Sequence, residues 1–192
     1  MRLTFQVAFL LLAFATPSMA QDASLRISQA ASQCTEELFE QAERSFDRRK
    51  FGSESLGIAE RQLSKVVCLC KELPGNFQAE EHLRVVHEER ANHNLSIALF
   101  YLGKFRDGKG GKAGALGRLK NITERYPDYS RLDQVLFLLA EISLNDRNYD
   151  EAASYYQRLI GAYPASQYIG EASIHLSDIY VLKAQKTGQS IP

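Results

Sequence analysis

Hydrophobic residues recur along most of the chain at spacings of three and four, which places them on one face of a helix. Four such stripes follow residue 33, and they run over residues 38–46, 56–70, 83–102 and 132–142. No segment shows the strict alternation of a half-buried strand. The pattern therefore predicts an all-α protein.

The helical stripes also repeat at a fixed distance. A shift of 37 residues places Tyr126-Pro127 on Tyr163-Pro164 and keeps the apolar positions in phase on both sides, with Ala115 on Ala152 and Leu139 on Leu176. Turn residues separate the stripes near positions 50–52, 74–75, 108–111, 126–127, 146–148 and 163–164. A period in the thirties with two helices per unit is typical of stacked helical hairpins.

Two segments resemble tetratricopeptide repeats in the spacing of their residues. The fuller one runs from Leu136 through Leu139-Ala140, Ala152 and Tyr156 to Pro164, and the other from Leu99 to Pro127. Residues 33–73 match more loosely, and 167–186 resemble the first helix of a further repeat. The resemblance implies a solenoid of stacked antiparallel helical hairpins, with about three and a half repeats over residues 33–186.

Within that superfamily, three segments are similar to periplasmic repeat proteins of Gram-negative envelopes, and they are residues 42–51, 126–142 and 149–172. The nearest is the outer-membrane β-barrel assembly component D family, followed by the Tol–Pal coordinator family. Members of the first family are usually lipoproteins with five repeats, whereas this chain has fewer repeats and no lipid-attachment cysteine. The resemblance implies a non-enzymatic scaffold for a protein or peptide of the envelope, acting in outer-membrane assembly or in Tol–Pal coordination.

The first twenty residues have the layout of a secretory signal peptide. A positive start at Arg2 precedes nine apolar residues, 7–15, and Ser18-Met19-Ala20 supplies small residues before a cleavage point. Residues 21–32 are small and polar, as in a linker, and 187–192 are expected to form a flexible tail. We therefore expect an exported, periplasmic protein, and no later stretch is apolar enough to span a membrane.

Charge and candidate motifs favour no catalytic or nucleic-acid function. The 192 residues carry 23 Lys and Arg against 23 Asp and Glu, so the chain lacks the excess positive charge of a nucleic-acid binder.

His82, His87 and His93 lie five and six residues apart, which is the wrong spacing for two metal ligands on one helix. We expect a solvated helix face, with a metal site as the alternative. Residues 108–114 are rich in glycine but lack the hydroxyl residue of a phosphate-binding loop. This favours a turn between helices, in which Lys109 and Lys112 contact an acidic partner. We expect no enzyme activity, cofactor or metal.

The first helix of each hairpin lines the concave surface of such a solenoid. The residues expected there, as a groove for a protein segment, are Ile97, Phe100, Lys104, Gln134, Phe137, Glu141, Glu171, Ile174 and Asp178. Phe100 and Phe137 each lie one residue away from the core stripe, and packing between neighbouring repeats is an equal alternative for both. A structural, oligomerising solenoid without a ligand groove is a further alternative, and the sequence indicates neither the partner nor the oligomeric state.

The three cysteines allow one disulfide. Cys34 lies eighteen residues before Gly52, where the first hairpin turns, and Cys70 lies eighteen residues after it, so antiparallel helices bring the two level. Cys68 and Cys70 lie about 200° apart around one helix and cannot pair with each other. The sequence thus predicts a Cys34–Cys70 bridge, with Cys68 as the second choice of partner and three unpaired thiols as the alternative.

Overall fold

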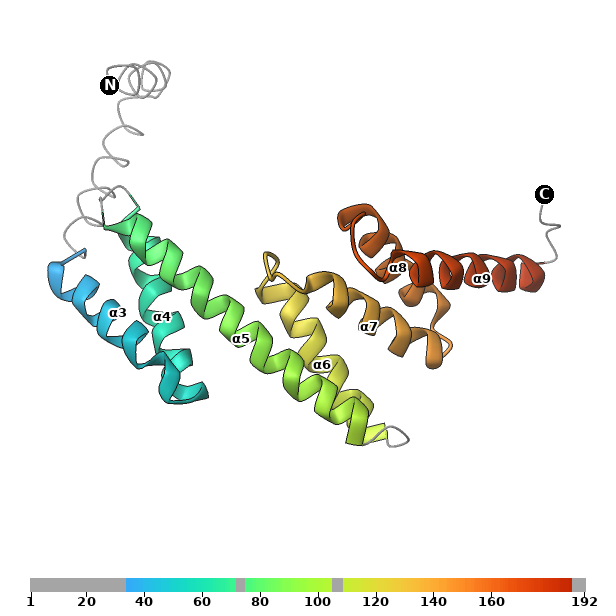
Figure 1. Ribbon diagram of the computed structural model, residues 1–192, viewed down its shortest axis with the longest axis horizontal. Coiled ribbons are helices and arrows are strands. Elements are labelled where there is room, and N and C mark those ends of the chain that lie inside the picture. Colours follow the sequence, from blue (N-terminus) through green and yellow to red (C-terminus); the bar gives the residue numbers. More distant parts are fainter. Residues whose placement is uncertain (1–33, 72–74, 105–108, 188–192) are drawn as a thin grey trace, which may run out of the picture. The chain divides into compact units, whose positions relative to one another are not determined.

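The structure is a computed structural model that describes residues 34–71, 75–104 and 109–187 (Figure 1). The segments predicted as a signal peptide (1–20) and as a linker (21–32) lie outside these residues, as does the predicted tail except for Thr187. The described residues form seven α-helices and one short 3₁₀ helix, and none of them is in a strand. The predicted all-α fold is confirmed.

The helices are α3 (Glu36–Arg48), α4 (Ser53–Leu69), α5 (Asn76–Lys104), α6 (Lys109–Arg125), α7 (Leu132–Asn145), α8 (Tyr149–Ala162) and α9 (Ile169–Thr187), and the 3₁₀ helix η2 is Arg49–Phe51. They form two compact units, which divide between Val86 and His87 within α5. The segment predicted as one repeat domain thus contains two units, each with its own core.

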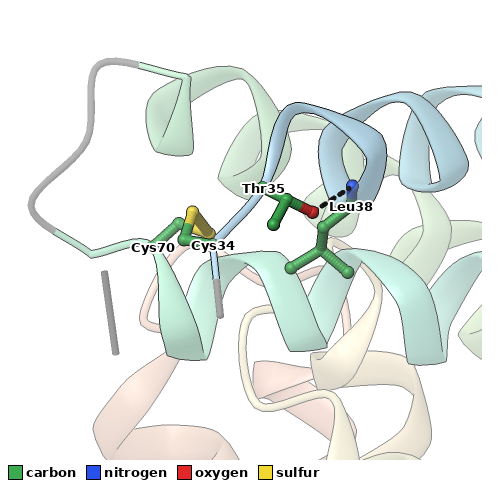
Figure 2. Close-up of a disulfide and its surroundings, with 4 residues drawn as sticks. All are labelled: Cys34, Thr35, Leu38 and Cys70. Carbon is green, nitrogen blue, oxygen red and sulfur yellow. Dashed lines mark hydrogen bonds between the residues drawn. A yellow bond between two sulfur atoms is a disulfide. The ribbon is translucent and has the colours of Figure 1, made fainter. Parts of the chain in front are cut away.

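The first unit is a helical hairpin of α3 and α4 with the beginning of α5. Gly52 makes the turn with a φ of 128°, a conformation that glycine adopts without steric cost. Thr35 begins α3 by accepting a hydrogen bond from the Leu38 backbone N–H, at 3.3 Å (Figure 2). The core members are Leu38, Ala42, Leu56, Ala59, Leu63, Val66, Cys70, Ala79 and Val86.

A disulfide joins Cys34 to Cys70 at the open end of this hairpin, away from the turn (Figure 2). The two Cα atoms are 5.6 Å apart, and Cys70 is 1% exposed within the core. Cys68, two residues earlier, is exposed and unbridged. The structure therefore joins the pair that the hairpin geometry indicates.

The second unit contains the end of α5 and helices α6 to α9, with α7 at its centre. Leu139 of α7 packs in a cluster with residues of α5 and α6, such as Leu95 and Leu119. Leu136 of the same helix packs in another cluster with residues of α8 and α9, such as Tyr156 and Ile179. Because α7 buries two faces, it connects the hairpin before it to the helices after it.

The two Tyr-Pro pairs end equivalent helices in this unit. The Tyr126 backbone N–H donates to the Ile122 carbonyl and the Tyr163 N–H to the Leu159 carbonyl, each at 2.9 Å. Proline follows in both cases and stops the helix. Tyr126 is 2% exposed, and its hydroxyl accepts a 3.1 Å hydrogen bond from Arg90 Nε. The 37-residue repeat thus corresponds to a repeated packing unit.

The glycine-rich segment 108–114 was predicted as a turn, and this is wrong for most of it, because α6 begins at Lys109. Glycine weakens a helix by about 1 kcal/mol relative to alanine, but burial outweighs that cost here. Gly111 is buried, and a Cβ on Gly114 would lie 3.5 Å from the Tyr101 ring. Lys112 binds Asp146 of its own chain at 2.7 Å, so the acidic contact expected of Lys112 is intramolecular.

Candidate functional site

The predicted groove residues all lie on the first helices α5, α7 and α9 of the second unit. Phe100, Phe137 and Ile174 occupy equivalent positions, 37 residues apart. Phe100 is 55% exposed and Ile174 is 63% exposed, whereas Phe137 is half-buried. Of the others, Ile97, Gln134 and Glu141 are half-buried, Glu171 and Asp178 are exposed, and the side chain of Lys104 is outside the described part.

Phe137 differs from its equivalents because the next repeat covers it. Its ring stacks on Tyr168, just before α9, with centroids 4.7 Å apart and 18° between the planes. The Tyr156 ring of α8 lies 6.3 Å away on a tilted plane. Packing between repeats, the alternative for both aromatic residues, therefore describes Phe137. Phe100 and Ile174, in contrast, expose apolar surface to solvent.

A surface pocket of about 410 Å³ lies at the C-terminal ends of α5 and α7. Its lining residues are Leu102, Gly103, Lys112, Leu138, Glu141, Ile142 and Asn145. A Cβ built on Gly103 has no atom within 4 Å, so the glycine leaves the wall open. The volume lies within the range of small-ligand and side-chain pockets. Apolar walls with one acidic and one basic side chain suit part of a peptide.

Of these lining residues, the sequence indicated Glu141 as part of the groove and Lys112 as a contact for an acidic partner. Leu102 and Ile142 belong to the apolar stripes that the helical period assigns to the core, and Leu138 lies beside the stripe. Periodicity does not show which of these apolar side chains line an open pocket. Gly103 is the sequence feature that could have indicated the pocket, because a small residue near the end of a first helix leaves space between neighbouring helices. The pocket follows from tertiary packing.

A hydrogen-bonded cluster holds Glu141 at the pocket. The buried Tyr156 hydroxyl donates to Glu141 Oε1, and His175 Nδ1 lies 2.8 Å from the same oxygen. His175 Nδ1 is also 2.9 Å from the Tyr156 hydroxyl oxygen. The three side chains come from α7, α8 and α9, so the cluster ties these helices together and orients the carboxylate.

The Tyr156 phenol is kept neutral in this cluster. Burial raises the pKa of Tyr156 far above its usual value, and the hydrogen bond to Glu141 and the nearby Glu141 and Glu171 charges raise it further. A phenol in this state donates a hydrogen bond but does not serve as a base near neutral pH. The cluster is therefore suited to positioning Glu141.

This raised pKa predicts a loss of stability in alkali. Unfolded tyrosine ionises near pH 10, whereas folded Tyr156 keeps its proton, so the free energy of unfolding falls as pH rises above about 10. Tyr156→Phe removes the titrating group and is expected to flatten part of that slope, which urea unfolding between pH 8 and about 11 measures. An unchanged slope would contradict the raised pKa.

The three histidines considered as metal ligands have separate surroundings. In the first unit, the His82 ring stacks on Phe46 at 3.8 Å, and its Nδ1 lies 3.1 Å from Glu43 Oε1. In the second unit, His87 lies 5.2 Å from the Tyr126 ring, and His93 is exposed. The solvated face predicted for all three is thus wrong for His82. Among the described residues, no group of three or more His, Cys, Asp or Glu side chains is placed to hold a metal ion.

Comparison with known families supports the repeat architecture. Residues 134–166 match a family model described as a tetratricopeptide repeat. The chain contains a tetratricopeptide repeat. The match covers α7 and α8 together, the hairpin whose sequence resembled a complete repeat. No match was found among curated proteins or among solved structures.

None of the described helices is long and apolar enough to cross a membrane. A repeat of this type is typical of scaffolds that bind other proteins, so the pocket and the exposed Phe100 and Ile174 are the candidate binding surface.

Proposed function

We propose that this protein is a non-enzymatic, exported scaffold of the cell envelope, and that its second unit binds a protein or peptide segment at the pocket formed by α5, α6 and α7. The observation that carries the proposal is the pocket itself, about 410 Å³ with Leu102, Leu138 and Ile142 in its walls. Stacked helical hairpins bind partners on the surface that their first helices form.

The side chains at the pocket supply both affinity and orientation. Apolar walls favour burial of an apolar side chain of the partner, at about 25 cal/mol per Å² removed from water. Glu141, oriented by Tyr156 and His175, accepts hydrogen bonds at the edge. Exposed Phe100 extends the apolar surface along α5. Together they suit a segment with an apolar anchor and a nearby hydrogen-bond donor.

The envelope location rests on the signal-like residues 1–20 and on the resemblance to periplasmic repeat proteins. Outer-membrane protein assembly is the role that the resemblance favours, and Tol–Pal coordination is the alternative. A reporter enzyme that is active only outside the cytoplasm, fused after residue 32, tests export. An inactive fusion would remove the envelope part of the proposal and leave peptide binding untouched.

Filling the pocket is expected to weaken peptide binding strongly. Gly103→Leu places a side chain into the open space, and the change also raises helix propensity, so the fold is retained. Peptides selected from a displayed random library on the wild-type protein are expected to lose at least about tenfold in affinity, because their apolar anchor is displaced. Isothermal titration calorimetry measures the loss.

Gly117→Leu in α6 is the matched control. Gly117 is also a helical glycine with no atom within 4 Å of a built Cβ, and it is not among the pocket-lining residues. Affinity equal to wild type in this control, with loss in Gly103→Leu, supports the proposal. Selected peptides that bind all three proteins equally would place the binding surface elsewhere.

A further inference from the structure

The first unit contains a second pocket that the proposed function does not use. It has a volume of about 440 Å³ and lies between the C-terminal half of α3 and the N-terminal half of α4, near the Gly52 turn. Its lining residues are Gln41, Arg44, Ser45, Arg48, Ser55, Ile58 and Gln62. The turn joins the two helices at one end and the Cys34–Cys70 disulfide joins them at the other, so the helix pair is held before any ligand arrives.

The positive charge of this pocket is local. Residues 34–86 carry ten Asp and Glu against eight Lys and Arg, so the segment as a whole is acidic. The lining nevertheless includes two arginines and no acidic residue. Arg44 and Arg48 are four residues apart on α3 and therefore project from the same face, one turn apart. The pocket is thus a positive site on an acidic segment.

The two arginines are available to a ligand. Arg44 Nη1 contacts Glu40 Oε2 at 3.0 Å, and both side chains are more than half exposed, so solvent screens this pair and a competing carboxylate can replace Glu40. The Arg48 side chain is exposed, and no hydrogen bond or ion pair joins it to another described residue. A guanidinium group binds a carboxylate through two parallel hydrogen bonds.

The other lining residues restrict the kind of anion. Ile58 of α4 is 38% exposed and adds an apolar wall beside the cations, and Ser55 and Gln62 add hydrogen-bonding groups on the same helix. A free phosphate would leave the apolar wall in water. A peptide with acidic and apolar side chains next to each other satisfies both parts of the pocket.

We propose that the α3–α4 pocket binds an acidic segment of a partner protein, with carboxylates on Arg44 and Arg48 and an apolar side chain on Ile58. The observations that support this occupant are the charge complementarity, the replaceable Glu40 contact and the exposed Ile58. The site is separate from the pocket at α5 and α7, and it does not depend on what that pocket binds.

The test uses a fluorescein-labelled, glutamate-rich peptide with a central leucine, and fluorescence polarisation with the protein lacking residues 1–20 but otherwise complete. Glu40→Gln is expected to tighten binding about threefold, because it frees Arg44 and removes a competing carboxylate. Arg48→Gln is expected to weaken binding about fivefold. The lysine-for-glutamate version of the peptide is expected not to bind.

Glu81→Gln and Arg84→Gln are the matched controls, because Glu81 and Arg84 form an exposed intrahelical pair in the same unit that does not line the pocket. These variants make the same charge changes and are expected to leave affinity unchanged. Equal effects of Glu40→Gln and Glu81→Gln would show a general charge effect and overturn the site. Preferential binding of inorganic phosphate or of phosphatidylglycerol vesicles would overturn the acidic peptide as its occupant.

Discussion

Replacing Cys34 and Cys70 together with serine is expected to lower the free energy of unfolding of the first unit by about 3–4 kcal/mol. The bridge closes a loop with a sequence separation of 36, and a loop of this length restricts the unfolded chain strongly. Cys70 is also part of the hydrophobic core, so its replacement by a polar serine adds to the loss. The bridge acts on a small unit, which consists of one hairpin and the start of α5.

Urea unfolding with and without reductant measures this effect. Reduced wild-type protein is expected to approach the stability of the double variant, and the double variant is expected not to respond to reductant. Cys68→Ser is the matched control, since Cys68 is exposed and unbridged, and it should leave stability within about 0.5 kcal/mol. Three free thiols in peptide maps of protein from an oxidising compartment would contradict the bridge.

The sequence contained enough to indicate this pairing because the hairpin is locally determined. Equal distances on both sides of Gly52 fix which residues lie level, and helical phase fixes which cysteine faces inward. The same kind of reasoning identified the α7–α8 repeat, where spacing of small and apolar residues determines how two adjacent helices cross. Helical periodicity and the residue preferences of turns act over short sequence distances, so both can be recognised in a single sequence.

Contacts between segments that are distant in the sequence could not be predicted from local patterns. Phe100 and Phe137 have the same place in the repeat, but only the structure shows that Tyr168 stacks on Phe137. The start of α6 was misplaced because local glycine propensity indicates a turn, whereas burial of Gly111 favours a helix. His82 was assigned to a solvated face, yet Phe46 and Glu43 contact it from another helix. Each of these differences comes from packing that no local pattern records.

The repeat also makes a prediction about how stability is distributed in the second unit. Leu139 and Leu176 are equivalent residues of successive repeats, 37 positions apart. Leu139 is fully buried because α7 has helices packed on both sides, whereas Leu176 of α9 is only partly buried. In a solenoid, a terminal helix lacks the neighbour that covers its outer face. Leu176, at the end of the described stack, is therefore expected to contribute less to stability than Leu139.

Leu139→Ala is accordingly expected to lower the free energy of unfolding by about 3–4 kcal/mol, since it leaves a cavity among residues of α5, α6 and α7. Leu176→Ala is expected to cost about half as much, because water fills the space beside a partly exposed side chain. Urea unfolding of both variants, followed by circular dichroism at 222 nm, compares the two losses directly. Equal losses would mean that α9 is covered as completely as α7, and that a further element packs on its outer face in solution.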